Sequence, residues 1–178
     1  VGELNWFAKP RELALKDNVC LYSVVDKALN MGRHDTRGIK VANNIPRELR
    51  VLGSETHLWQ VAGNLLKNSI TALANAGRGD SAEIKVTASI EPLASDGRPR
   101  RVMLSWFDNG VGIEPDKLKY IFDSFFTTSY FNEGIGLGMG VCKNIVDKHE
   151  GSIDIKSEYG EWTRVNIHLI ASLDEDAN

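Results

Sequence analysis

One long helical segment constrains the fold of this chain more than any other feature of its sequence. Residues 55 to 76 contain no proline, Ser54 stands where a helix N-cap is expected, and Gly77 stands where a C-terminal glycine is expected. At about 100° per residue, the small and apolar side chains of this segment fall on one stripe, formed by Leu58, Val61, Ala62, Leu65, Ser69, Ala72, Leu73 and Ala76. A helix with such a stripe needs a second layer to cover it, and a sheet is the expected cover.

The same helix carries four short polar residues beside the apolar stripe. Asn64, Asn68, Thr71 and Asn75 fall within a sector of about 60°. They could form an ordinary solvated face, but asparagine is a poor helix former compared with Lys or Glu. An asparagine side chain offers an oxygen to a hard cation and an amide donor to a phosphate. The pattern therefore favours the wall of a binding site over a plain surface.

The rest of the chain alternates short apolar runs with turn residues, which predicts a sheet. We expect a strand at 19–22, a helix at 23–32, a pair of short strands at 39–42 and 49–52, hairpin strands at 82–90 and 101–107, a short helix around 116–122, a second long helix at 139–148, and a final hairpin with strands at 152–157 and 162–169. This order predicts an α/β (α+β) sandwich, in which about three helices cover one face of a mixed, mostly antiparallel sheet.

Composition argues against several classes of protein. The 21 Lys and Arg residues nearly balance the 24 Asp and Glu residues, and the net charge of -3 gives no reason to expect nucleic acid as a partner. No stretch approaches the roughly 20 consecutive apolar residues of a membrane span, so no membrane contact is expected. The two cysteines, Cys20 and Cys142, lack the spacing of a zinc site or a disulfide scaffold.

A second candidate site directly follows the strand predicted at 101–107. The sequence there is Asp108-Asn109-Gly110-Val111-Gly112-Ile113. Two glycines after an acidic residue allow the backbone to turn tightly beside a ligand. A carboxylate only accepts hydrogen bonds, and this suits recognition of an exocyclic amine such as that of adenine. In isolation, the same string could be only a turn.

A glycine-rich run precedes the second long helix. In Gly134-Ile135-Gly136-Leu137-Gly138-Met139-Gly140, alternate glycines expose backbone N–H groups, and the helix N-terminus that follows favours phosphate. The run is not a dinucleotide fingerprint, because no strand leads into it. It is not a Walker loop either, because no Gly-Lys-Ser/Thr sequence follows it. Between the two glycine segments, Phe122-Asp123-Ser124-Phe125-Phe126-Thr127 could form a hydrophobic plug or the base of a lid over a nucleotide.

Taken in order, these segments resemble the catalytic and ATP-binding domain of sensor histidine kinases, whose fold is shared with gyrase, heat-shock chaperone and mismatch-repair ATPases. Asn64 to Asn68 is similar to the N box of that family, and Asp108 to Ile113 to its first glycine box. Phe122 to Thr127 resembles the phenylalanine box, and Gly134 to Met139 the second glycine box. The resemblance identifies residues 19–170 as the ATP-binding catalytic domain. Residues 1–18 are then a linker or the end of a preceding dimerisation and acceptor segment, and residues 171–178 an acidic tail or linker.

The resemblance implies a role for individual residues of this sequence, with ATP and Mg²⁺ as the cofactors. It makes Asn68 the Mg²⁺ ligand, supported by Asn64 one turn earlier. It makes Asp108 the acceptor of the adenine amino group, with Thr163 nearby sharing a water. The other nucleotide contacts that it implies are Gly110, Gly112 and Ile113 beside the base, Phe122, Phe125 and Phe126 beneath a lid that begins at Thr127, and Gly136, Leu137 and Gly138 along the phosphates.

One position separates the kinases of this family from its ATPases. The ATPases carry a Glu, which activates water, four residues before the metal-binding Asn, whereas this chain has Asn64 there. Because an amide cannot act as a general base at neutral pH, the kinase interpretation is favoured over hydrolysis. A non-catalytic nucleotide-sensing module is a third alternative, because the expected lid carries no Lys or Arg and Thr71 stands where many of these kinases have one. Candidate contacts to the γ-phosphate are Lys67, Lys143, Thr127, Thr128 and the acceptor domain.

The phosphate acceptor is expected to lie outside this chain. None of the four histidines has the Glu/Asp-x-x-x-Pro context of the family's acceptor helix, so each is expected to be a surface or packing residue: His34, His57, His149 and His168. The resemblance implies an upstream dimerisation and phosphoacceptor-histidine domain in the same protein, a homodimer of the full-length protein, and a response regulator or receiver domain. It also implies a cytoplasmic location, as the cytoplasmic portion of a sensor that could be membrane-bound.

Overall fold

The computed structural model describes residues 17–93, 95, 97–123 and 137–172. Its elements, in chain order, are β1 Asp17–Cys20, α1 Leu21–Met31, β2 Lys40–Asn44, β3 Arg50–Gly53, α2 Glu55–Ala76, the 3₁₀ turn η1 Gly79–Ser81, β4 Glu83–Ile90, β5 Arg101–Asp108, α3 Pro115–Leu118, α4 Leu137–Lys148, β6 Ser152–Glu158 and β7 Trp162–Ile170. No helix within the described ranges is long and apolar enough to cross a membrane.

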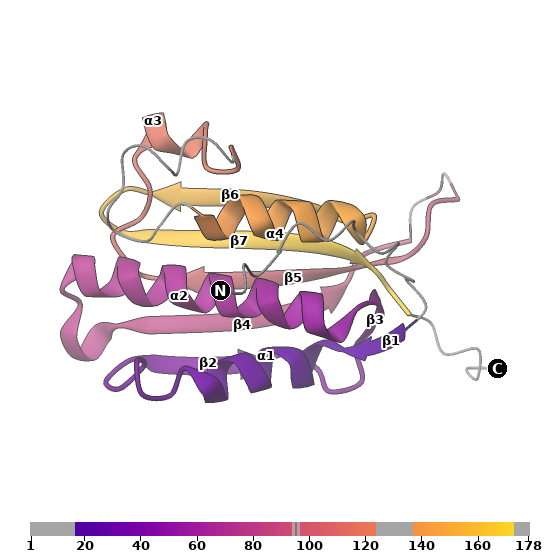
Figure 1. Cartoon of the computed structure of the whole chain (residues 1–178), viewed down its shortest axis with the longest axis horizontal. Coiled ribbons are helices and arrows are strands. Elements are labelled where there is room, and N and C mark those ends of the chain that lie inside the picture. The colour runs from indigo at the N-terminus through magenta and orange to yellow at the C-terminus, as the bar shows by residue number, and fades with distance from the viewer. Residues whose placement is uncertain (1–16, 94, 96, 124–136, 173–178) are drawn as a thin grey trace, which may run out of the picture.

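A five-stranded sheet forms one layer of the molecule, and α1, α2 and α4 form the other (Figure 1). The strand order is β2-β4-β5-β7-β6, with β2 and β4 parallel and every other neighbouring pair antiparallel. A separate two-stranded sheet joins β1 to β3. The predicted two-layer sandwich with a mixed, mostly antiparallel sheet is therefore confirmed.

Helix α2 has the bounds and the ends that the sequence predicts. The Ser54 side chain accepts a hydrogen bond from the backbone N–H of His57, and Gly77 takes a left-handed conformation with φ of 60°. The predicted apolar stripe faces the sheet, and its members Leu58, Val61, Ala62, Leu65, Ser69 and Leu73 are buried. Each fully buried leucine or valine contributes roughly 1.5–3 kcal/mol from the hydrophobic effect, so this stripe anchors α2 to the sheet.

Two predictions about the N-terminal elements are wrong. Helix α1 begins at Leu21 rather than at Ser23, because Leu21 is itself buried and continues the apolar stripe of Val24, Val25 and Ala28. The strands predicted at 39–42 and 49–52 do form, but they do not pair with each other. Strand β2 pairs with β4, and β3 pairs with β1.

The remaining elements agree with the predictions except at their ends. The β4–β5 and β6–β7 hairpins form, and β5 extends to Asp108. The short helix α3 ends at Leu118, and residues 119–122 continue as turns.

Candidate functional site

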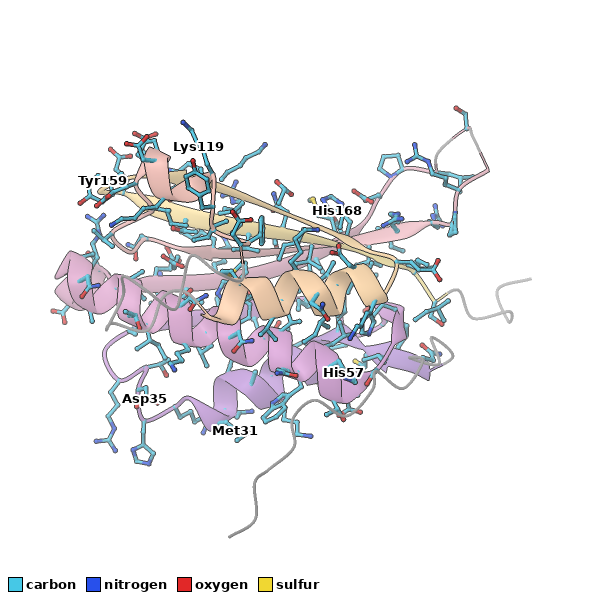
Figure 2. All side chains as sticks on the ribbon, turned by 45° about the horizontal axis from the view of Figure 1, so that its top comes forward. Met31, Asp35, His57, Lys119, Tyr159 and His168 are labelled. Atoms are coloured by element: carbon cyan, nitrogen blue, oxygen red, sulfur yellow. The ribbon has the colours of Figure 1, made fainter. Side chains whose placement is uncertain are left out.

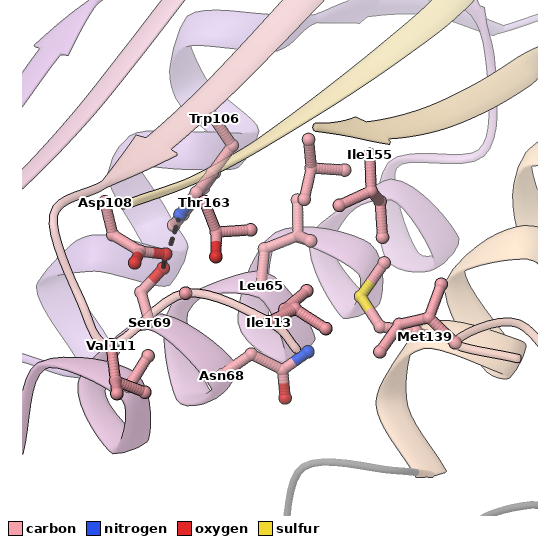
Figure 3. Close-up of a pocket in the computed structure, with 14 residues that line it drawn as sticks. Leu65, Asn68, Ser69, Trp106, Asp108, Val111, Ile113, Met139, Ile155 and Thr163 are labelled. Carbon is pink, nitrogen blue, oxygen red and sulfur yellow. Dashed lines mark hydrogen bonds between the residues drawn. The ribbon is translucent and has the colours of Figure 1, made fainter. Parts of the chain in front are cut away.

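A pocket opens between α2 and the sheet, beside the end of β5 (Figure 3). Its floor is apolar, with Leu65 from α2, Ile155 from β6 and Val165 from β7. Its polar atoms come from a few side chains, chiefly Asp108 and Asn68. An apolar pocket with a few convergent polar groups is the common form of a small-molecule site.

Asp108, the last residue of β5, is the buried acid of this pocket, with only 5% of its surface exposed. Its Oδ2 accepts a hydrogen bond from the Ser69 hydroxyl at 2.7 Å, and its Oδ1 accepts one from the Gly110 backbone N–H at 3.0 Å. Burial raises the pKa of this carboxyl, and the hydrogen bonds from Ser69 and Gly110 oppose that rise because they stabilise the carboxylate. Two donors leave lone pairs on both oxygens for a ligand.

Ser69 and Trp106 form a polar connection that the sequence analysis missed. The indole Nε1–H of Trp106 donates to the Ser69 hydroxyl at 3.1 Å, and the hydroxyl in turn donates to Asp108 (Figure 3). Ser69 was grouped with the small residues of the apolar stripe. A serine in a buried stripe needs a hydrogen-bond partner, and this is the signal that could have identified it.

Thr163 lies directly opposite Asp108 in the β5–β7 register and lines the same pocket, so the structure brings these two predicted residues together. Ser157 on β6 connects Thr163 to the loop after β5. Its hydroxyl donates to the carbonyl of Trp162 at 2.7 Å and accepts from the backbone N–H of Ile113 at 2.9 Å. The Thr163 hydroxyl, 3.1 Å away, is then the donor to Ser157, which leaves its oxygen lone pairs free to accept.

The two glycines after Asp108 are required by the protein's own packing. At Gly110, a Cβ would come within 2.6 Å of the Ala72 side chain. At Gly112, φ is 70°, and a Cβ would collide with the carbonyl oxygen of Glu158, the last residue of β6 before the β6–β7 turn. The loop after β5, residues 109–113, is called the glycine loop. It packs tightly against both α2 and the β6–β7 hairpin, in addition to the role beside a base that the resemblance implies.

Arg78, just after α2, ties this loop to the β6–β7 turn. Its Nε donates to the carbonyl of Asn109 at 2.7 Å, and its Nη2 donates to the carbonyls of Gly160 at 2.5 Å and Glu161 at 3.1 Å. No local pattern indicates this role of Arg78, because its partners are backbone atoms remote in sequence.

Asn68 lines the pocket, and Asn64 lies one turn earlier on α2. The first turn of α4 lies close to both residues. A Cβ on Gly138 would be 3.4 Å from the Asn64 Cβ and 3.6 Å from the Asn68 Nδ2. The structure thus brings the predicted Asn pair to the N-terminal end of α4, where the helix dipole favours an anion.

Some predicted residues lie elsewhere or outside the described ranges. Phe122 packs against the core, and its neighbour Ile121 lines the pocket instead. The Lys143 ammonium is paired with Asp147 at 2.9 Å, and the Thr71 hydroxyl donates to the carbonyl of Lys67. The predictions that fall outside the described residues are those for Phe125, Phe126, Thr127, Thr128 and Gly136, and the Leu137 side chain is likewise not described.

No histidine lines the pocket among the described residues. His57 at the start of α2 contacts Ser54, and His168 on β7 contacts Glu91 at 2.7 Å (Figure 2). His149 is fully buried, and its Nε2 accepts from the Ser54 backbone N–H at 3.0 Å while its Nδ1 lies 2.8 Å from the carbonyl of Ile145. His149 is therefore a packing residue, as predicted.

This chain is similar to known proteins along most of its length. A family model described as "Histidine kinase-, DNA gyrase B-, and HSP90-like ATPase" matches residues 53–172. Sensor histidine kinase ZraS of Salmonella typhimurium is 33% identical over 178 residues, covering 95% of this chain and 34% of ZraS. Signal transduction histidine-protein kinase BaeS of Escherichia coli is 30% identical over 125 residues, covering 68% of this chain and 24% of BaeS. This chain spans about a third or less of the length of these relatives.

Solved structures share the fold. The mycobacterial sensor histidine kinase MprB superposes with a TM-score of 0.69 at 22% identity, covering 89% of this chain and 99% of that chain. The catalytic domain of histidine kinase ThkA superposes with a TM-score of 0.67 at 24% identity, covering 86% and 94%.

Proposed function

This chain belongs to the histidine kinase-, DNA gyrase B-, and HSP90-like ATPase family, and on this premise we propose that it is the ATP-binding catalytic domain of a sensor histidine kinase. It binds ATP with Mg²⁺ and transfers the γ-phosphate to a histidine outside this chain. The relatives named sensor histidine kinases support this proposal over an ATPase.

The observation that carries the proposal is the buried acid at the end of β5. Asp108 has both oxygens in contact with protein donors, and it sits in a pocket whose walls are otherwise largely apolar. A flat aromatic base fits such walls, and its exocyclic amine can donate to the remaining lone pairs of the carboxylate. A charge-assisted hydrogen bond in a dry pocket is among the stronger polar contacts that a protein can offer a ligand.

Asn68 is the residue that would hold Mg²⁺. Within the described residues there is no cluster of three His, Cys, Asp or Glu side chains able to hold a metal by itself. Mg²⁺ suits a site with few protein ligands, because it commonly takes one or two protein oxygens and completes its octahedron with water and phosphate oxygens. The Asn68 amide, between the pocket and the first turn of α4, fits that requirement. Bound there with ATP, the metal would neutralise charge on the phosphates.

Asn64 favours phosphotransfer to a protein over hydrolysis. It occupies the position one turn before Asn68, and its amide cannot take a proton from water at neutral pH. Because no described histidine faces the pocket, the acceptor is proposed to lie on an upstream dimerisation domain of the same protein, which would form a homodimer. A response regulator or receiver domain would then receive the phosphate, and the domain is proposed to lie in the cytoplasm, where ATP is available.

Calorimetry with Mg-ADP tests the nucleotide site. The wild-type chain should bind, and Asp108→Asn should lose most of the affinity while remaining folded. The substitution is conservative, since an amide oxygen can still accept from Gly110 and the amide nitrogen can donate to Ser69. Unchanged affinity in the folded variant would contradict the assignment of Asp108 to the adenine amine.

Mixing the chain with the acceptor domain of the same protein and labelled ATP tests the activity. An acid-labile phosphoprotein would support transfer to histidine. Rapid phosphate release without a phosphoprotein would favour the ATPase relatives, and Asn64→Glu tests the same point by adding the missing base. Binding with neither activity would favour a nucleotide-sensing module.

A further inference from the structure

We propose that Ser69 and Trp106 are specificity-determining residues of this site, which hold Asp108 as a pure hydrogen-bond acceptor and thereby select a 6-amino purine over a 6-oxo purine. The inference rests on the proposed function, because it takes the ligand to be a purine nucleotide. Neither residue needs to touch the nucleotide base, so both act as positioning residues through Asp108.

The direction of each hydrogen bond follows from the chemistry of the three side chains. An indole N–H can only donate, so the 3.1 Å contact fills an acceptor position of the Ser69 hydroxyl. The single proton of that hydroxyl is then directed to Asp108 Oδ2 at 2.7 Å. The Gly110 N–H, also only a donor, faces Oδ1 at 3.0 Å. Both partners of this carboxyl among the described residues are therefore donors, and the group that faces the pocket is an acceptor.

Trp106 gives the serine hydroxyl its direction. A serine within a helix commonly turns its hydroxyl back to the carbonyl four residues earlier, which here belongs to Leu65. The indole occupies one side of the Ser69 oxygen and leaves the proton for Asp108. Ser69 is 1% exposed and Trp106 is 2% exposed, so water does not replace either partner. The two side chains come from α2 and β5, and only the packing of the helix on the sheet brings them together.

Among the described residues, no second titratable side chain lines the pocket. The described lining residues come from α2, β5, the loop after β5, the turn after α3, β6, β7 and α4, and Asp108 is the one titratable side chain among them. Loss of the Ser69 hydroxyl would leave Asp108 Oδ2 without this donor and free the carboxyl to turn. Adenine would lose its oriented acceptor, whereas a 6-oxo group, which cannot donate to a carboxylate, would lose nothing.

The test is calorimetric binding of Mg-ADP and of Mg-IDP, which carries an oxygen in place of the amine of adenine. It uses the 178-residue chain as wild type, Ser69→Ala and Trp106→Phe. Ser105→Ala is the matched control, because Ser105 lies on β5 between buried residues and points to the opposite face of the sheet. Thermal unfolding shows which variants are folded, and Ser69→Ala is retained as the main variant if the larger change at Trp106 prevents folding.

We expect wild type to prefer ADP, and Ser69→Ala to weaken ADP binding about tenfold while IDP binding changes by less than about twofold, as for the loss of one charge-assisted hydrogen bond. Trp106→Phe should shift the ADP-to-IDP ratio in the same direction, and Ser105→Ala should leave it unchanged. Equal weakening of both nucleotides in Ser69→Ala would mean that the residue is merely structural and would overturn the inference, as would an unchanged ratio. Absence of ADP binding in wild type would instead overturn the proposed function itself.

Discussion

Replacing Gly112 with alanine isolates the cost of the tight contact between the glycine loop and the β6–β7 turn. Gly112 and Gly77 both have left-handed backbones, with φ of 70° and 60°. An alanine in this conformation costs roughly 1–2 kcal/mol at either position. A Cβ at Gly77 would meet nothing within 4 Å, whereas a Cβ at Gly112 would collide with the Glu158 carbonyl and lie 3.0 Å from the Tyr159 Cα. Gly77→Ala is therefore a matched control.

The turn that faces Gly112 has little freedom to move away. The Gly160 N–H donates to the carbonyl of Val111 at 2.6 Å, and Arg78 binds the carbonyls of Gly160 and Glu161. Forcing a methyl group into a packed site costs about 1–3 kcal/mol, so the total for Gly112→Ala is about 2–5 kcal/mol against about 1–2 kcal/mol for Gly77→Ala.

Thermal unfolding followed by circular dichroism measures this difference. For a domain of this size, each kcal/mol lowers the melting temperature by roughly 2–4 °C, so we expect a loss of about 2–8 °C for Gly77→Ala and about 4–20 °C for Gly112→Ala. Gly112→Ala should also weaken ADP binding, because the loop carries Ile113 into the pocket, and Gly77→Ala should not. Equal melting temperatures for the two variants would refute the reasoning, since they would show that the turn relaxes around the added methyl group.

Three further predictions concern side chains at other places in the fold. Burial lowers the pKa of His149, so the neutral ring stabilises the fold above about pH 6.5, and that stability is lost as the pH falls through the folded-state pKa. Urea unfolding between pH 7.5 and 5 should therefore show a smaller pH dependence in His149→Gln than in wild type, and an equal pH dependence would contradict this. Burial raises the pKa of Cys142 to about 12 and keeps its thiol protonated. A thiol reagent at pH 8 should therefore label only Cys20 in the native chain and both cysteines in denaturant, and rapid labelling of native Cys142 would contradict its full burial. Asn68→Ala should keep or slightly raise thermal stability, because alanine is the better helix former, and should remove the Mg²⁺-dependent part of nucleotide affinity. Calorimetry with and without Mg²⁺ measures this part, and an unchanged Mg²⁺ effect would exclude Asn68 as the ligand.

The sequence by itself determined the parts of this protein that depend on local interactions. The bounds of α2 follow from Ser54 and Gly77, and its buried face follows from the 3.6-residue period. The two hairpins follow from alternating strands separated by turn residues. Local pattern made Asp108 and Asn68 candidates, as an acid before two glycines and an amide beside the apolar stripe of a helix, and the family resemblance implied the role of each.

Only the tertiary structure decided which distant segments meet. Strand β2 pairs with β4 and not with β3, which is nearer in sequence. The connecting chain is long enough for either pairing, so the choice depends on how α1 and α2 pack on the sheet. The start of α1 at Leu21 was set by the same packing, which made this residue part of the core.

The finer structure of the site was also beyond the reach of local patterns. In the sequence, Ser69 cannot be distinguished from the other small residues of the apolar stripe. Its role becomes visible only in the structure, where Trp106 and Asp108 of β5 contact its hydroxyl. In the sequence, Arg78 looks like an ordinary surface charge. In the structure, it donates to backbone carbonyls of the glycine loop and of the β6–β7 turn. Hydrogen bonds between elements depend on the positions of both partners, and a single chain's local periodicity specifies only the direction in which each side chain leaves its own helix or strand.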